Sequence, residues 1–547
     1  MNLLILLAPF LTASTEELPE CSDNITFPAG ILEIPDYYCD SYCQNVTNLS
    51  LVDLSHTQVQ MIGKKSFYKC KNLKTILFPN SLETVGEDAF YGSGIEEADL
   101  SKTNVKIIEK YAFFNCTGLR NVIFPESLKT IENSAFESSN ITSANFSRTN
   151  VTEIRFRAFY KSIMLKNVLF SNSLKFIAEY AFAETEIQNA DFSGTSLTEI
   201  ENYAFHNCKS LKGVIFSRNL EIIKDGAFWG SGILEADLSQ TKMTDIASYT
   251  FFLCSNLKTI IFPAMLETVG SSALQMSGIE EADLSSTNVK EIRNYAFYSC
   301  EDLLNVTFPS SLQIIGQSAF RQSGIQMANL LQTQVTEIRK STFLLCEDLN
   351  FVTFPDSLQL IEERAFYHTG IQEANLSNTN VTIIQKNAFS DCKSLKNVVF
   401  PKTNFTLQGN VFETTTPDNF VFSCQNEAHN VQYLNEEFCN KTNKPCIEGR
   451  GPLYDALLEN VGCGNFTRCT ESTPNNLPPC DSSAEPPQDG DNSSNITTVY
   501  PFTKITEPIT ERTEPFTERT EPVTERTEPF TERTEPVTER TEPFTER

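Results

Sequence analysis

Residues 112–157 read AFFNCTGLRNVIFPESLKTIENSAFESSNITSANFSRTNVTEIRFR, and this stretch contains the pattern that decides the fold. Its opening Ala-Phe returns 23 residues later at Ala135-Phe136. Stepping through the chain by 23 residues from Phe67 meets sixteen positions, and fifteen of them hold Phe. With 41 Phe in 547 residues, chance would fill about one of the sixteen, so a repeat governs the whole region. The positions are Phe67, Phe90, Phe113, Phe136, Phe159, Phe182, Phe205, Phe228, Phe251, Leu274, Phe297, Phe320, Phe343, Phe366, Phe389 and Phe412.

The full unit has 46 residues and consists of two alternating halves. One half reads AFxxCxxLxxVxFPxSLxxI, and the other reads AFxxSGIxxADLSxTxVxxI. Each half holds an apolar segment whose last two apolar positions are two residues apart, which predicts a short strand with one inward face. Sixteen such segments run from Leu49 to Leu395. The Ser and Thr columns, as at Ser101 and Thr103, are expected to satisfy backbone groups where the chain turns.

A period of 20 to 29 residues with L-x-x-L-x-L-like strands is the leucine-rich repeat signature. The 23-residue phase, the closing Ala-Phe, the Cys three residues after that Phe and the FPxSL turn resemble the BspA-like leucine-rich repeats over about residues 25 to 412. The resemblance implies an α/β-type repeat solenoid with a parallel concave sheet and about 16 repeats, belonging to an extracellular or surface antigen of the adhesin type. Alternate halves depart from the pattern, since they replace FP by Leu-Ser and Cys by Ser.

The composition along the chain divides it into six regions. Proline in every TEP[IFV]TER heptad and a single apolar residue per heptad exclude a coiled coil, so a disordered, extended tail is expected. The expected regions are a signal peptide at 1–15, an N-terminal cap at 16–48, the solenoid at 49–412, a Cys-rich C-terminal cap at 413–480, a linker at 481–505 and the heptad tail at 506–547. A buried N-terminal helix is the alternative to the signal peptide.

Charge and processing signals indicate where the protein works. A formal net charge of −27 disfavours nucleic acid and anionic lipid as partners. Fifteen N-x-[ST] acceptors, from Asn24 to Asn495, together with the apolar leader, predict a secreted or cell-surface glycoprotein. No later stretch has the 18 or so apolar residues of a membrane helix, so no transmembrane segment is expected in this sequence.

The sequence contains no constellation for catalysis or for holding a cofactor. Its four histidines, His56, His206, His368 and His429, are far apart and have no partner at metal-ligand or nucleophile spacing. We therefore predict no catalytic residue, no metal, no cofactor and no enzymatic activity. An unfamiliar site in the C-terminal Cys-rich region is the remaining alternative.

The sixteen cysteines fall into two groups. Seven follow the 46-residue period with Ser162 standing in the gap, and they are Cys70, Cys116, Cys208, Cys254, Cys300, Cys346 and Cys392. Neighbours in this column lie two turns apart, about 9.6 Å, whereas a disulfide needs Cα atoms within about 7 Å, so buried free thiols are expected. The disulfide candidates are the nine terminal ones, Cys21, Cys39, Cys43, Cys424, Cys439, Cys446, Cys463, Cys469 and Cys480. The odd number at the N-terminus leaves one thiol that is either free or paired to Cys70.

Outward strand positions form the candidate binding surface on the concave sheet. Apolar and acidic residues alternate there from turn to turn, which predicts a contact surface for a basic partner. The predicted partner-binding residues are Leu77, Asp99, Ile123, Leu169, Asp191, Ile215, Asp237, Ile261 and Asp283. The predicted function is an adhesin that binds an extracellular protein or glycan on host cells or matrix. The alternative is a structural or antigenic coat protein without a specific ligand.

Overall fold

The computed structural model describes residues 18–23, 25–45, 48–402, 404–415, 417, 419–422 and 446–449. The chain divides into two compact units, Met1–Asp481 and Ser482–Arg547, and every described residue belongs to the first. The predicted signal peptide, linker and heptad tail lie outside the described residues, as do five of the candidate disulfide cysteines, Cys424, Cys439, Cys463, Cys469 and Cys480.

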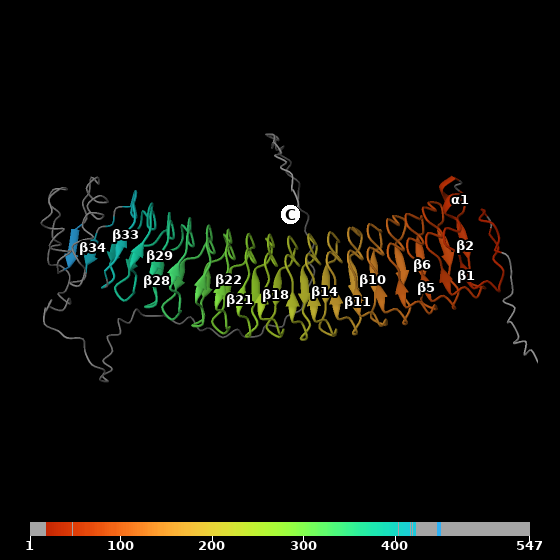
Figure 1. Ribbon diagram of the computed structural model, residues 1–547, viewed down its shortest axis with the longest axis horizontal. Coiled ribbons are helices and arrows are strands. Elements are labelled where there is room, and N and C mark those ends of the chain that lie inside the picture. Colours follow the sequence, from red (N-terminus) through yellow and green to blue (C-terminus); the bar gives the residue numbers. More distant parts are fainter. Residues whose placement is uncertain are drawn as a thin grey trace, which may run out of the picture. The chain divides into compact units, whose positions relative to one another are not determined.

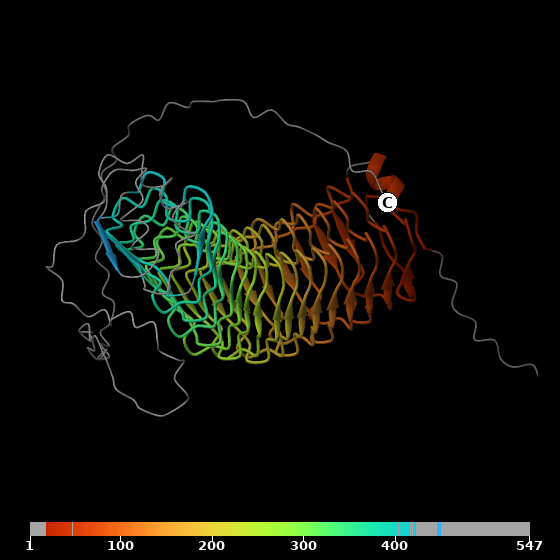
Figure 2. The same ribbon diagram turned by 60° about the vertical axis from the view of Figure 1, so that its left-hand side comes forward.

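The first unit is a solenoid of parallel strands, which confirms the predicted fold (Figure 1). Each turn contributes one three-residue strand to one wall and one two-residue strand to the other, and Figure 2 shows the successive turns stacked. The three-residue strands are β2 (Leu51–Asp53), β4 (Thr75–Leu77), β6 (Glu97–Asp99), β8 (Asn121–Ile123), β10 (Ser143–Asn145), β12 (Asn167–Leu169), β14 (Asn189–Asp191), β16 (Gly213–Ile215), β18 (Glu235–Asp237), β20 (Thr259–Ile261), β22 (Glu281–Asp283), β24 (Asn305–Thr307), β26 (Met327–Asn329), β28 (Phe351–Thr353), β30 (Glu373–Asn375) and β32 (Asn397–Val399).

The opposite wall is built from two-residue strands. They are β1 (Glu33–Ile34), β3 (Met61–Ile62), β5 (Thr84–Val85), β7 (Ile107–Ile108), β9 (Thr130–Ile131), β11 (Glu153–Ile154), β13 (Phe176–Ile177), β15 (Glu199–Ile200), β17 (Ile222–Ile223), β19 (Asp245–Ile246), β21 (Thr268–Val269), β23 (Glu291–Ile292), β25 (Ile314–Ile315), β27 (Glu337–Ile338), β29 (Leu360–Ile361), β31 (Ile383–Ile384) and β33 (Thr406–Leu407). The segments between the walls are turns, so helix in the described residues is confined to α1 (Asp40–Asn45).

The spacing of the three-residue strands alternates, although the Phe column keeps a strict 23. Asp53 and Leu77 are 24 residues apart, whereas Leu77 and Asp99 are 22 apart. The extra residue lies in the Cys-containing half, between its Phe and its strand. All three residues of β2 pair with β4, but only Thr75 of β4 pairs with β6. The 46-residue sequence unit is therefore also a structural unit of two closely paired strands.

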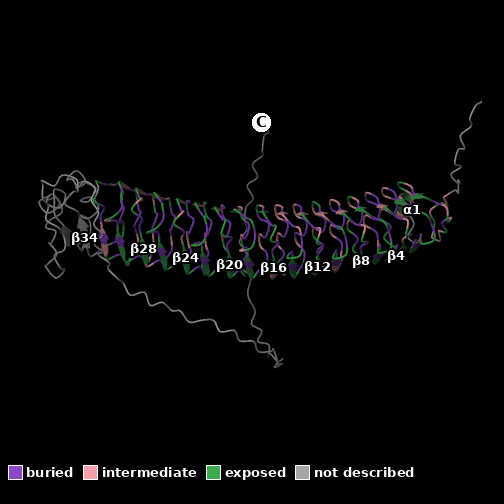
Figure 3. Cartoon of the chain, turned by 90° about the horizontal axis from the view of Figure 1, so that it is seen from below, coloured by how far each residue is buried: buried purple, intermediate pink, exposed green. Residues whose placement is uncertain are grey.

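The Phe column forms the centre of the core. Successive rings lie parallel within 15°, with centroids between 5.1 and 5.8 Å apart. All of these Phe side chains are fully buried, and Leu274 takes the one position without a ring. Figure 3 shows that buried and exposed residues recur along every turn of the solenoid. The expected inward orientation of this column is confirmed, since stacked columns bury the apolar side chains of every turn.

The turns after the three-residue strands are stabilised by threonine. Thr103 Oγ1 donates to the backbone carbonyl of Leu100 at 2.8 Å. The same bond recurs at Thr57, Thr149, Thr195, Thr241, Thr287, Thr333 and Thr379. At the Ser position, in contrast, the main-chain N–H of Ser101 takes part, and it donates to Asp99. The expectation for the Thr column is thus confirmed.

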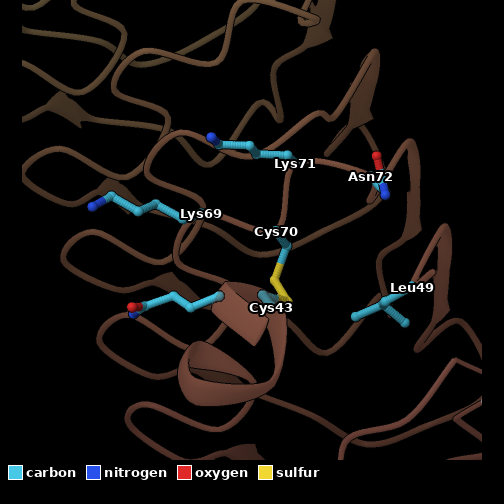
Figure 4. A pocket seen from close by; sticks show the side chains of 7 residues that line it. Cys43, Leu49, Lys69, Cys70, Lys71 and Asn72 are labelled. Atoms are coloured by element: carbon cyan, nitrogen blue, oxygen red, sulfur yellow. A yellow bond between two sulfur atoms is a disulfide. The ribbon is translucent and has the colours of Figure 1, made fainter. Parts of the chain in front are cut away.

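Two disulfides close the N-terminal end. Cys21 is bonded to Cys39, and Cys43 on α1 is bonded to Cys70 in the first regular turn, as Figure 4 shows for the second pair. Of the two alternatives for the unpaired N-terminal thiol, the structure has the bond to Cys70. A solenoid exposes its core at its ends, and this bond holds α1 against the first turn. Beyond residue 412 the sheet continues through β34 (Asn419–Phe422), which pairs in parallel with β32, and β35 (Cys446–Gly449), which pairs in parallel with β34.

Candidate binding face

The outer side of the three-residue strands, called here the strand face, carries the predicted partner-binding residues. The middle residue of each strand is buried, and from β4 to β30 the third is exposed, because successive side chains of a strand point to opposite sides. Leu77, Ile123, Leu169, Ile215 and Ile261 are 43 to 55% exposed, which is unusual for large aliphatic side chains in one column. Parallel register aligns each of them with the third residue of the preceding strand.

The aspartates between these aliphatic residues have a structural role. Oδ1 of Asp99, Asp191, Asp237 and Asp283 accepts a hydrogen bond from the backbone N–H two residues later, at 2.9 to 3.0 Å. Asn145 makes the same bond to the N–H of Ser147 at 3.0 Å. Since an amide oxygen serves as well as a carboxylate, Asp and Asn interchange along this column, and the bond ends the strand in an Asx turn. Only part of each carboxylate is therefore left for a partner.

The aliphatic column ends after Ile261. Its next two members are Thr307 and Thr353, whose hydroxyls donate to Asp283 and Asn329 on the preceding strands. The bond from Thr307, with the bonds from Ser285, lowers the pKa of Asp283 below its ordinary value. At these two positions a hydrogen-bonded pair of polar side chains thus replaces the exposed aliphatic side chain. The apolar part of the column extends from Leu77 to Ile261.

A hollow interrupts the strand face at β16. The first strand position there is Gly213, where neighbouring strands have Asn189 and Glu235. A shallow space of about 690 Å³ lies there over β14, β16 and β18. It is lined by Asn189, Ser193, Lys212, Gly213, Val214, Ile215, Phe216, Arg218, Leu234, Glu235, Asp237 and Gln240. Ile215 and Leu234, 54 and 43% exposed, give the hollow an apolar wall.

The ladder cysteines offer no reactive chemistry. Cys116, Cys208, Cys254, Cys300, Cys346 and Cys392 are free and buried. Each Sγ donates to the backbone carbonyl of the residue 26 positions earlier, as Cys254 does to Phe228 at 3.1 Å. Ser162 replaces the thiol and makes the same bond to Phe136 at 2.8 Å. Burial raises the pKa of Cys254 to about 12, so the reactive thiolate is suppressed.

Two further surfaces are not identified by the sequence analysis. On the turns, rings of Tyr203, His206, Trp229 and Phe252 contact one another, with Trp229 and Phe252 centroids 4.5 Å apart. Along one margin of the strand face, basic residues recur every 46 residues, at Lys74, Arg120, Lys166, Lys212 and Lys258. The L-[KR]-x-V/I pattern within each Cys-containing half is the signal from which this second surface could be found.

Neither a metal site nor a membrane helix is found in the described residues. No group of three or more His, Cys, Asp or Glu side chains there is arranged to hold a metal ion. Across the same residues, no helix has the length and apolar character needed to cross a bilayer.

The stacked turns, parallel walls and buried Phe and Leu columns define a leucine-rich repeat protein. The chain matches the family described as the BspA type leucine rich repeat region, in six copies, over residues 32–155, 147–242, 235–333 and 329–438. It therefore belongs to the BspA-type leucine-rich repeat family.

One solved structure supports this fold, and two others are reported with it as similar chains. A leucine-rich repeat protein from Bacteroides ovatus is 22% identical with a TM-score of 0.53, covering 74% of this chain and 93% of that one. One from Eubacterium ventriosum is 19% identical with a TM-score of 0.34, covering 62% and 88%. The pneumococcal vaccine antigen PcpA is 17% identical with a TM-score of 0.30, covering 70% and 84%. No curated protein matches the sequence.

Proposed function

We propose that this protein is a secreted or surface-associated, non-enzymatic binding protein, an adhesin that docks a protein partner on the strand face. The observation that carries the proposal is the exposed aliphatic column from Leu77 to Ile261. The register places these side chains on alternate strands, so the column extends over eight strand spacings, about 40 Å, which suits a standard protein interface.

The carboxylates of the strand face would orient this partner. In Asp191 and Asp237 the Asx turn holds Oδ1. In the part of the chain that the structure describes, no side chain or backbone group forms a hydrogen bond or ion pair with their Oδ2. A basic side chain of the partner that reaches these exposed oxygens gains a charge-assisted bond, so binding should weaken with salt. The hollow at Gly213 lies between the two aspartates and would accept a protruding side chain of the partner.

One potential glycosylation site lies within this surface. Asn145 occupies the column between Ile123 and Leu169 and begins the sequence Asn-Phe-Ser. Its Oδ1 is bonded to Ser147, and a glycan on Nδ2 would cover the neighbouring aliphatic side chains. Binding by the glycosylated and enzymatically deglycosylated chain should therefore be compared, with the stronger binding expected from the deglycosylated form.

The proposal is tested by binding of the labelled full chain to intact cells and to reconstituted extracellular matrix, together with its distribution between cells and spent medium. Saturable binding that unlabelled chain displaces is the expected result. Non-saturable binding to every surface would instead support the alternative of an antigenic coat protein without a specific ligand.

A further inference from the structure

A row of basic residues borders the strand face. In the alternate turns from β4 to β20, the residue just before the three-residue strand is Lys74, Arg120, Lys166, Lys212 or Lys258, and all five are exposed. Backbone hydrogen bonds connect the row through the intervening turns, as from Lys166 N–H to Thr142 and from Gln188 N–H to Lys166, at 3.0 and 3.1 Å. Equivalent members of the row lie two strand spacings apart, about 10 Å.

The ends of this row are neutralised within the protein. Lys74 Nζ lies 3.0 Å from Glu96, and Lys258 Nζ lies 3.3 Å from Glu280 and 2.7 Å from Asp302. Their carboxylate partners reduce the charge that a ligand would meet at these two positions.

The central three residues, Arg120, Lys166 and Lys212, form the basic stripe. Within the described residues, none of these three side chains forms an ion pair. The turns between them place Thr142 and Gln188 in the row, and both are uncharged. An exposed stripe of three uncompensated cations in a chain of net charge −27 has no evident role in folding.

The strand positions beside the basic stripe are also uncharged. The first residues of β8, β10, β12 and β14 are Asn121, Ser143, Asn167 and Asn189, and carboxylates return only at Glu97 and Glu235 on either side. Amides and hydroxyls at these positions can donate and accept hydrogen bonds. The stripe is thus a cationic margin next to a neutral, hydrogen-bonding row of first strand positions, and the aspartates of the strand face lie two residues further along their strands.

We infer that the basic stripe binds a linear anionic polysaccharide lying along this margin of the strand face. Cations repeated at a constant spacing fit the anionic groups of a repeating polymer, whereas an acidic protein surface has no reason to repeat. The adjacent row of amides and a hydroxyl provides partners for sugar hydroxyls. This ligand differs from the basic protein partner proposed above, since its contacts lie at the margin rather than on the aliphatic column.

Heparin is the probe, as a linear sulfated polysaccharide, and the full chain is titrated with it at several salt concentrations. The test variant carries Arg120→Gln, Lys166→Gln and Lys212→Gln. The control variant removes the same charge at three lysines of the other wall's margin, Lys106→Gln, Lys242→Gln and Lys290→Gln. Each control lysine is already ion-paired, to Glu83, Glu221 and Glu267.

The parent should bind heparin with an affinity that falls as salt rises, and the test variant should bind about tenfold more weakly at low salt. The control variant should stay within about twofold of the parent, because its lysines are compensated. Equal losses in both variants would show a general charge effect and overturn the inference. Stronger binding of poly-glutamate than of heparin would also overturn it, in favour of an acidic protein. Neither result bears on the aliphatic column, whose test uses other residues.

Discussion

The column of buried thiols should make the solenoid sensitive to alkali. Burial raises the pKa of Cys116, Cys254, Cys300 and Cys346 to about 12, and that of Cys208 and Cys392 to about 11. In the unfolded chain these thiols return to their ordinary pKa of 9.0. Above pH 9 the unfolded state loses protons that the folded state keeps. The stabilisation that the protonated thiols contribute is therefore fully present below pH 9 and is lost as the pH rises toward 12.

The size of the effect follows from the two pKa values. At pH 10, one unit above the unfolded pKa and below the folded pKa, each thiol lowers the free energy of unfolding by about 1 kcal/mol. The six together lower it by several kcal/mol, a large part of an ordinary domain's stability. Other titrating groups contribute as well, so the thiol contribution must be isolated by substitution.

Cys254→Ser isolates one thiol. Ser162 already occupies the same position of another turn and bonds to Phe136, so the fold accepts serine here. Guanidinium unfolding of parent and variant at pH 7 and pH 10 gives four free energies, and the other titrations cancel in their double difference. The variant should lose about 1 kcal/mol less than the parent between the two pH values. A double difference near zero would mean that Cys254 is not a buried, protonated thiol.

Three further results are expected. Phe205→Ala should cost about 3 to 5 kcal/mol, since it removes a fully buried ring from the stack, and unchanged stability in chemical unfolding would place that column in solvent. Under native conditions a thiol reagent should leave the six free ladder cysteines unlabelled, and mass mapping should find Cys70 in a disulfide with Cys43; a disulfide between two ladder members would contradict the spacing of the turns. Thr307→Val should raise the pKa of Asp283 toward its ordinary value, as measured by NMR titration, and thereby reduce a stabilisation that is present above about pH 4 and lost as the pH falls.

Most of the fold could be predicted from the residues that recur periodically in the sequence. Phe205 and its equivalents recur every 23 residues. Their positions are sufficient to predict the number of turns and which side chains point into the core. The constant 23-residue spacing of this column does not reveal the alternating 24- and 22-residue spacing of the strands. One half-repeat has its extra residue before the strand, and the other has it after the strand. Direct comparison of Asp53, Leu77 and Asp99 reveals the alternation.

The candidate site was predictable only in part. The outward position of Ile123 and Leu169 follows from strand alternation, but the Asx turns of Asp191 and Asp237 require the backbone path after the strand. The sequence does contain one signal of these Asx turns: Asn145 takes the place of Asp in this column, and an amide oxygen can accept the same hydrogen bond. The bond between Cys43 and Cys70 joins residues 27 apart across the cap, and spacing within the ladder contains no information about it.

The central claim is that the aliphatic column of the strand face binds the partner. It is tested most directly with a variant carrying Ile123→Ser, Leu169→Ser and Ile215→Ser, all exposed positions whose replacement should leave the fold intact. The matched control makes exposed apolar positions of the other wall polar, with Met61→Ser, Ile107→Ser and Ile222→Ser, which are 37 to 45% exposed.

Saturable binding of both variants and the parent to the same cells or matrix is the decisive measurement, with circular dichroism and chemical unfolding to establish equal folding. The strand-face variant should bind at least about tenfold more weakly than the parent, while the control binds as the parent does. Parental affinity in a correctly folded strand-face variant, or an equal loss in the control, would contradict the claim.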